Sequence, residues 1–172
     1  MALSIPKATI RRARPGDLDK IYQIERRSFP TPWPKILLRR YLREEGFLAY
    51  EIDEQVVGYV ISDMKHPSWV TRLEQMTLKI LKHPSWDAAM RVGHIKNLAV
   101  DPSFRKRGIG KALLEETLNY LKDLKADSVE LEVRTDNRTA FRLYIKYGFA
   151  IKRKIHRYYQ NGDDAFLMIR EL

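Results

Sequence analysis

The chain has 172 residues, of which 44% are hydrophobic and 31% charged, a composition typical of one globular domain with its own core. The absence of cysteine excludes disulfides, zinc–thiolate sites and a cysteine nucleophile, and no apolar run is long enough to span a bilayer. The formal charge of +10 leaves nucleic acid, an anionic cofactor and acidic proteins open as partners. With no apolar signal segment visible at the N-terminus, we expect a cytoplasmic protein.

The N-terminal part is predicted to form a strand, two helices and a hairpin. Three prolines between Pro30 and Pro34 end the first helix in a stiff loop, and Gly46 ends the second. The polar turn Asp53–Gln55 joins two strands as a hairpin. The expected elements are strand 10–13, helix 17–29, helix 35–45, strand 47–52 and strand 56–62.

Residues 63–92 contain a short repeat, because His66-Pro-Ser-Trp69 recurs as His83-Pro-Ser-Trp86. The apolar residues between the two copies have helical spacing. We therefore expect an inserted helical segment at about 63–92 within a single domain spanning 1–172. A lid or partner surface and a local packing element are equally compatible with this pattern.

The centre of the chain carries a loop suited to a pyrophosphate. A strand at 95–100 is followed by a turn at 101–103 and by a helix that begins at Ile109. Between them, three cations and two glycines precede the N-terminus of the helix, where free N–H groups and the helix dipole favour an anion. Arg105, Ala112 and Leu113 stand where the P-loop and dinucleotide motifs require other residues, so both motifs are excluded.

The C-terminal part is predicted to complete a mixed sheet. Gly148 ends a helix, and the Asn161-Gly162 pair indicates a hairpin turn. Hairpins at both ends of the chain and helical crossovers between the central strands give an α/β domain of three layers. The expected elements are strand 128–134, helix 137–147, strand 150–159 and strand 165–171.

Two motifs resemble those of a known enzyme family. R-x-x-G-x-G at 105–110 follows Leu98-Ala99-Val100, and L-E-V-R-x-x-N at 131–137 precedes A-x-x-L-Y-x-x-x-G-F at 140–149. Together they resemble the GNAT acetyltransferases, in particular the RimI-like and archaeal protein N-terminal acetyltransferases. The resemblance implies a mostly antiparallel sheet with a parallel central strand pair, and acetyl-CoA as cosubstrate. It implies contacts to acetyl-CoA from Leu98, Ala99, Val100, Arg105, Lys106, Arg107, Gly108, Ile109, Gly110, Lys111, Asn137 and Tyr144.

Glu132 is the first candidate for a general base. It lies in the middle of a strand where an apolar residue is expected, and burial would raise its pKa toward a useful range. Glu130 shares its strand face, so alternation does not distinguish the two, and the resemblance selects Glu132. An ion pair of Glu132 with Arg134 or Arg142 is the structural alternative.

His94 and Tyr144 are the other catalytic candidates. Imidazoles exchange protons near neutral pH, so His94 could act as the base, alone or through water with Glu132. The phenol of Tyr144 could donate a proton to the leaving thiolate, as the resemblance implies. The alternatives are a half-exposed histidine, a core tyrosine and, for Asn137, a helix cap.

The acceptor groove is expected from segments that resemble peptide-binding segments of that subgroup, although these aromatic residues could also be ordinary core. The residues proposed to line it are Phe29, Pro30, Trp33, Tyr158 and Tyr159. The subgroup that accepts small processed N-termini often carries L-P-E-N-Y where this chain has Phe29-Pro-Thr-Pro-Trp33, which leaves the preferred first residue open. The histidines lack metal-ligand spacing with carboxylates, so no metal is expected.

The expected function is transfer of an acetyl group from acetyl-CoA to the N-terminal α-amine of proteins, in a ternary complex without a covalent enzyme intermediate. Acetylation of a lysine side chain or a small-molecule amine is the alternative within the enzyme class. A non-catalytic basic module that docks on RNA or the ribosome is the alternative outside it. We expect protein or peptide N-termini as partners, neither a membrane nor a sequence-specific nucleic acid, and association with the ribosome is left open.

Overall fold

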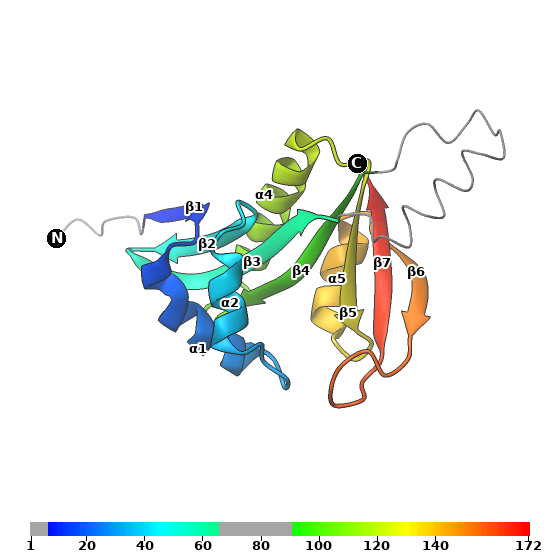
Figure 1. The fold of residues 1–172 in the computed structure, drawn as a ribbon, viewed down its shortest axis with the longest axis horizontal. Coiled ribbons are helices and arrows are strands. Elements are labelled where there is room, and N and C mark those ends of the chain that lie inside the picture. Colours follow the sequence, from blue (N-terminus) through cyan, green and yellow to red (C-terminus); the bar gives the residue numbers. More distant parts are fainter. Residues whose placement is uncertain (1–6, 66–90) are drawn as a thin grey trace.

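A computed structural model of the chain describes residues 7–65 and 91–172. Its strands form one sheet in the order β1-β2-β3-β4-β5-β7-β6 (Figure 1). Neighbouring strands are antiparallel except for the central pair β4–β5, which is parallel, so the predicted mixed sheet is confirmed. The strands are β1 Ala8–Arg12, β2 Phe47–Ile52, β3 Gln55–Met64, β4 Val92–Val100, β5 Ser128–Arg134, β6 Ala150–Ile155 and β7 Ala165–Glu171.

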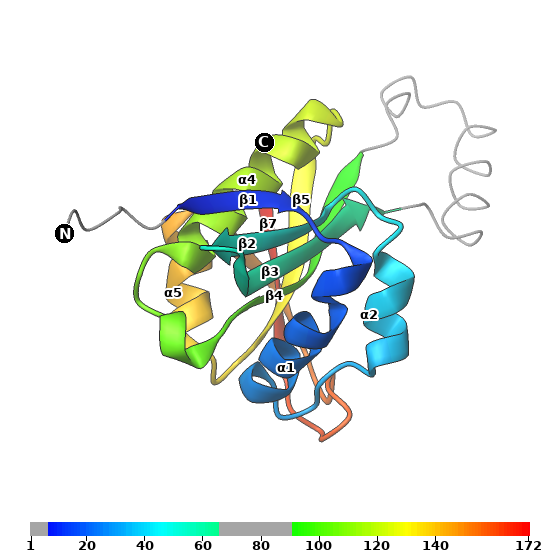
Figure 2. The same ribbon diagram turned by 90° about the vertical axis from the view of Figure 1, so that its left-hand side faces the viewer.

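Helices cover both faces of the sheet, as the three-layer prediction requires. Figure 2 shows α1 and α2 on one side and α4 and α5 on the other. No helix in the described part of the chain is long and apolar enough to cross a membrane. The helices are α1 Leu18–Ser28, α2 Lys35–Tyr41, α4 Ile109–Asp123 and α5 Arg138–Lys146, with short 3₁₀ helices η1 Pro15–Asp17 and η2 Pro102–Phe104.

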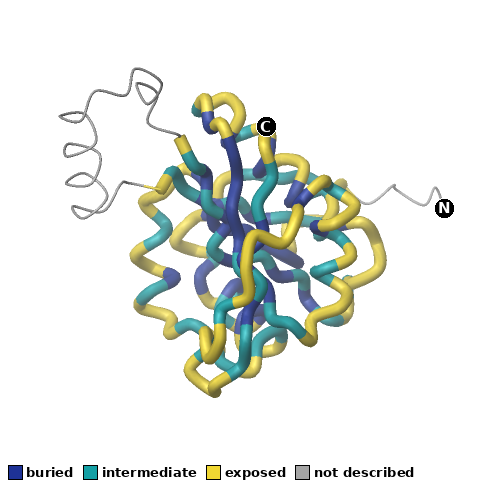
Figure 3. The backbone as a smooth tube through the Cα atoms, turned by 90° about the vertical axis from the view of Figure 1, so that its right-hand side faces the viewer, coloured by how far each residue is buried: buried dark blue, intermediate teal, exposed yellow. Residues whose placement is uncertain are grey.

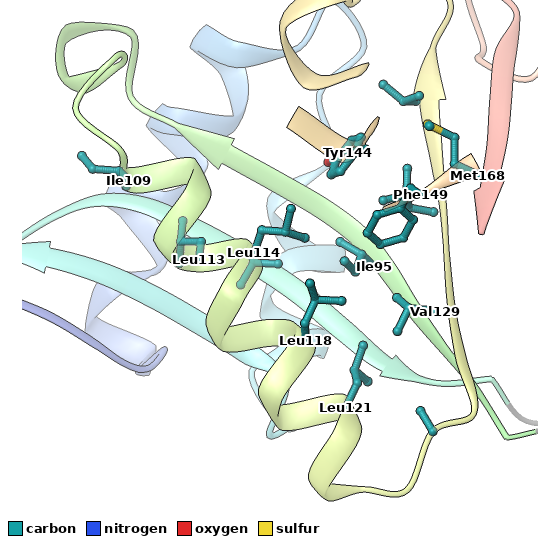
Figure 4. Packing of buried hydrophobic residues seen from close by; sticks show 14 of the residues in the cluster. Ile95, Ile109, Leu113, Leu114, Leu118, Leu121, Val129, Tyr144, Phe149 and Met168 are labelled. Atoms are coloured by element: carbon teal, nitrogen blue, oxygen red, sulfur yellow. The ribbon is translucent and has the colours of Figure 1, made fainter. Parts of the chain in front are cut away.

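The apolar side chains form one core on each face of the sheet. The buried stretches run through the central strands, whereas the connecting loops are largely exposed (Figure 3). On the α4 side, Leu118 and Leu121 point from the helix toward Ile95 of β4 and Val129 of β5 (Figure 4). On the other side, α1 and α2 pack on β2 and β3. The two cores hold the sheet rigid around its central strands.

Replacing Leu113 with alanine should lower the free energy of unfolding by about 2–5 kcal/mol, because a fully buried side chain would leave a cavity between α4 and β3. Urea unfolding monitored by circular dichroism measures the change. Ile36→Ala is the control, since Ile36 on α2 is 72% exposed and its removal should change stability by less than about 0.5 kcal/mol. Equal effects of the two substitutions would contradict this packing.

Two strands are longer than predicted. β4 begins at Val92 instead of 95, because Val92 and Gly93 pair with Ser128 and Val129 of β5 despite their weak apolar pattern. β3 continues to Met64, so residues 63, 64 and 92, at the ends of the segment expected as an insertion, belong to strands. His94 therefore lies inside the strand and not at its start. The repeated His-Pro-Ser-Trp segment and the helix expected between its copies lie outside the described residues.

Two elements are shorter than predicted. α2 ends at Tyr41 instead of 45, because the chain enters a turn in which the N–H of Glu44 bonds to the carbonyl of Tyr41. β6 ends at Ile155 instead of 159, because Arg157 adopts a left-handed conformation and its N–H bonds to Asp164. The remaining ends agree with the prediction within two residues.

Candidate active site

The sheet opens between its two parallel strands. β4 and β5 are paired from Val92–Ser128 to Ile95–Leu131 and then separate toward the other end (Figure 1). On its other side, β4 stays paired with β3 as far as Val100, with a bulge that leaves Lys96 without a register partner. The edge of β4 that faces β5 therefore has no strand partner from residue 96 onward, so an extended ligand could pair there as an added strand.

The loop after β4 has the geometry of an anion site. Gly108 caps α4 with φ of 81°, in the left-handed region that glycine adopts without strain. The first N–H to bond within this helix is that of Ala112, to the carbonyl of Gly108 at 2.9 Å. The preceding amides of Ile109, Gly110 and Lys111 point out of the helix end. The arrangement suits an anionic group, and its assignment to a pyrophosphate stays a prediction.

Two cations of this loop, Arg105 and Arg107, also stabilise its conformation. Arg105 donates from Nε to the carbonyl oxygen of Val100 at 3.1 Å and from Nη2 to Ser28 Oγ at 3.2 Å. The guanidinium of Arg107 lies 5.0 Å from the ring centroid of Phe104. Arg105 thus ties the loop both to the end of β4 and to α1, so the anion site and the helix beside it are held in one arrangement.

A cavity of about 390 Å³ occupies the opening between β4 and β5. It brings together residues from both ends of the chain, including all five that were expected to contact the acceptor. His94 and the loop at 105–111 do not line it. The predicted residues that do so are Phe29, Pro30, Trp33, Leu98, Glu132, Asn137, Tyr144, Tyr158 and Tyr159.

Glu132 and His94 form a hydrogen-bonded pair at this cavity. Nε2 of His94 lies 2.7 Å from Oε2 of Glu132, and both side chains are about six-sevenths buried, with 16% and 14% exposed. Glu132 forms no ion pair with Arg134 or Arg142, the two partners named as its structural alternative. Arg134 pairs with Asp136 and Asp163 instead. The two base candidates therefore form one carboxylate–imidazole unit.

The expected direction of the Glu132 pKa was wrong. Burial acts to raise it, but the hydrogen bond and charge of His94, with the charge of Lys65, hold the pKa of Glu132 below its usual value. The neighbouring Glu130 is engaged by Lys65 and Lys152 and does not line the cavity. Of the two carboxylates on this strand face, Glu132 is thus the one that a ligand in the cavity could meet.

Tyr144 faces the same cavity from α5. Its ring packs edge-on against Phe149, with 5.7 Å between centroids, and only 7% of the residue is exposed (Figure 4). Burial raises the pKa of Tyr144 to about 12, so its phenol keeps its proton at neutral pH. Asn137 accepts a hydrogen bond from the N–H of Ala140 at 3.1 Å, which is the capping role proposed as its alternative.

Two aromatic loops flank the cavity. In the first, Trp33 stacks on Tyr41 of α2 with 5.5 Å between ring centroids. In the second, Tyr158 and Tyr159 pack edge to face, and Arg134 lies 5.8 Å from the Tyr159 ring while it binds Asp163 at 2.6 Å. Arg134 therefore fastens the second loop to the end of β5.

Glu25 is a cavity residue that the sequence analysis missed. It is only 1% exposed, and its carboxylate accepts hydrogen bonds from Trp33, Tyr59 and Asn97. Burial raises the pKa of Glu25 above its usual value, although the hydrogen bonds from the three donors act to lower it. The sequence does carry a signal for Glu25. It continues the helical spacing of Leu18 and Ile21, which places a carboxylate on the apolar face of α1.

Comparison with known proteins decides the family. A model described as the acetyltransferase (GNAT) family matches residues 18–149, which is more than half of the chain. The chain belongs to this family. The predicted GNAT resemblance, fold class and acetyltransferase activity are confirmed at this level.

Individual GNAT relatives agree with this assignment over nearly the whole chain. An N-alpha-acetyltransferase of Sulfurisphaera tokodaii is 35% identical over 167 residues, covering 95% of this chain and 92% of the relative. The crystal structure of Ard1 from Thermoplasma volcanium is 30% identical, with a TM-score of 0.79 and coverage of 96% and 97%. Arabidopsis thaliana NAA60, crystallised with acetyl-CoA, shares the fold at 24% identity, with a TM-score of 0.77 and coverage of 96% and 100%.

Proposed function

We propose that this GNAT enzyme transfers an acetyl group from acetyl-CoA to the N-terminal α-amine of proteins. The observation that carries the proposal is the cavity between β4 and β5, which Glu132 and Tyr144 both line, with His94 hydrogen-bonded to Glu132. Aromatic loops at both rims give an extended peptide end apolar walls. The relatives named N-alpha-acetyltransferase support the choice of acceptor.

The residues around the opening fit acetyl-CoA as the cosubstrate, which would supply an activated thioester when bound. The amides of Ile109, Gly110 and Lys111 would hold its pyrophosphate at the N-terminus of α4. The edge of β4 at Leu98, which has no partner strand on the β5 side, would pair with the amides of its arm. Both groups belong to rigid elements, so the chain presents a preformed surface to this ligand.

The side chains of the cavity can then move the protons that the transfer requires. The Glu132–His94 unit takes a proton from the acceptor ammonium, directly or through water. Because the pKa of Glu132 is held low, its carboxylate is ionised beside the imidazole of His94. The hydroxyl of Tyr144 donates a proton to the departing sulfur. No covalent bond to the enzyme is needed for these steps.

Acetyl transfer to short peptides with different first residues, each with a free or a blocked α-amine, tests the proposal. We expect transfer that disappears when the α-amine is blocked. Transfer that survives blocking would move the target to lysine, and transfer to small amines alone would exclude a peptide acceptor. A cytoplasmic location and association with the ribosome, to which the charge of +10 is suited, stay predictions.

A further inference from the structure

A buried carboxylate in the cavity wall has no part in the proton transfers proposed above. Glu25 on α1 accepts from the N–H of Trp33 at 2.7 Å on Oε1 and from Nδ2 of Asn97 at 3.2 Å on Oε2. The hydroxyl of Tyr59 on β3 also donates to Oε2. Burial of a carboxylate is costly unless donors surround it, so this network fixes α1, the proline-rich loop and β4 relative to one another.

The bond to Glu25 determines which atom of the Asn97 amide faces the cavity. A carboxylate oxygen attracts the amide NH₂ and repels the amide oxygen, so Nδ2 must point to Glu25 and Oδ1 away from it. Asn97 lines the cavity, and no residue in the described ranges donates a hydrogen bond to Oδ1. Among the described residues, some polar side-chain atoms are fully buried and have no hydrogen-bond partner, and Oδ1 of Asn97 is not one of them. It is therefore an acceptor open to the cavity.

The bulge in β4 aims Asn97 in this direction. Successive side chains of a regular strand point to opposite faces, yet Lys96 and Asn97 both point toward the layer of α1 and α2. Lys96 lies 5.5 Å from the ring centroid of Tyr41 on α2, whereas Asn97 reaches Glu25 on α1. The register shift at this point allows the exception. Asn97 stands two residues beyond Ile95, where pairing with β5 ends and the cavity opens.

We propose that Oδ1 of Asn97 accepts a hydrogen bond from the attacking amine of the acceptor, and that Glu25 is a positioning residue that holds the amide in this orientation. An amide oxygen orients an N–H without taking its proton, which leaves proton removal to Glu132 and His94. The identity of the amine rests on the proposed function, but the contact applies to any amine that enters the cavity.

Asn97→Leu tests the contact, because leucine has a similar size and no acceptor. We expect the KM for a peptide acceptor to rise about tenfold, because the acceptor would lose one hydrogen bond to the enzyme. The affinity for acetyl-CoA, measured by calorimetry, should stay within about twofold, since the amides at the start of α4 are unchanged. Assays are run well below the unfolding temperature of each variant, because Glu25 loses one of its donors.

Glu25→Gln tests the orientation without changing the residue that meets the acceptor. The new amide would donate to Oδ1 of Asn97 and turn its NH₂ toward the cavity, so the KM for the peptide should rise by a similar factor. In Glu25→Gln/Asn97→Asp, the amide at position 25 donates to one carboxylate oxygen at position 97, and the other oxygen faces the cavity again. We expect this exchange to return the KM to within about threefold of the wild-type value.

An unchanged peptide KM in Asn97→Leu would overturn the proposal. A peptide KM in the double variant as high as that of Glu25→Gln would also overturn it. Both variants keep a hydrogen bond between positions 25 and 97, so a purely structural role gives no reason for the KM to recover in the double variant. A parallel loss of acetyl-CoA affinity would assign Asn97 to the cosubstrate instead. If the wild-type protein acetylates only lysine or small amines, the proposed function fails, and the same KM series on that amine still tests Asn97.

Discussion

Replacing Glu132 with glutamine should lower kcat for acetyl transfer by about 10²- to 10⁴-fold, the usual contribution of a general base. The substitution preserves the shape of the side chain and removes the charge that pairs with His94 across 2.7 Å. His94 would then take the acceptor proton without a counter-charge. Steady-state kinetics with saturating acetyl-CoA measures the effect, and the KM for the peptide should change little because Glu132 is assigned to proton transfer.

Glu130→Gln is a matched control for this prediction. Glu130 lies two residues away on the same strand face, but its carboxylate is bound by Lys65 and Lys152 and does not line the cavity. We expect its kcat to remain within about threefold of the wild-type value. A Glu130 variant as slow as the Glu132 variant, or a Glu132 variant with normal kcat, would remove Glu132 from the mechanism.

The order of the elements and the anion loop could be predicted because their signals are local. Strands and helices follow from the spacing of apolar residues, and Gly108 with the residues around it marks a helix start suited to phosphate. The boundaries of β4 and β6 could not be predicted in the same way. Val92 and Gly93 become strand because β5 pairs with them, and β6 stops early because Asp164 captures the N–H of Arg157.

The candidate site could be predicted residue by residue but not as an arrangement. Glu132 and His94 were each singled out, yet their contact depends on the register in which β4 and β5 run side by side. The direction of the Glu132 pKa followed from that contact, so burial alone gave the wrong sign. Asn97 carried no signal of its own, because a bulge decides which way its side chain points.

Replacing Tyr144 with phenylalanine should lower kcat by about 10²-fold or more, because the departing sulfur would lose its proton donor while the ring keeps its packing against Phe149. Burial raises the pKa of Tyr144 to about 12, so the wild-type phenol stays protonated and its contribution should not vary with pH between 6 and 9. The ratio of wild-type to variant kcat across this range measures both the size and the pH independence of the effect.

Tyr147→Phe provides the comparison for Tyr144→Phe. Tyr147 directly follows α5, and its hydroxyl donates a hydrogen bond to Glu115 at 2.6 Å. Neither Tyr147 nor Glu115 lines the cavity. Both substitutions remove one phenolic oxygen, so a general effect on α5 would appear in both, whereas loss of a proton donor would appear only at Tyr144. If Tyr144→Phe retains normal kcat, or if its effect grows with pH as for a group titrating near neutrality, Tyr144 is a core residue and another group protonates the sulfur.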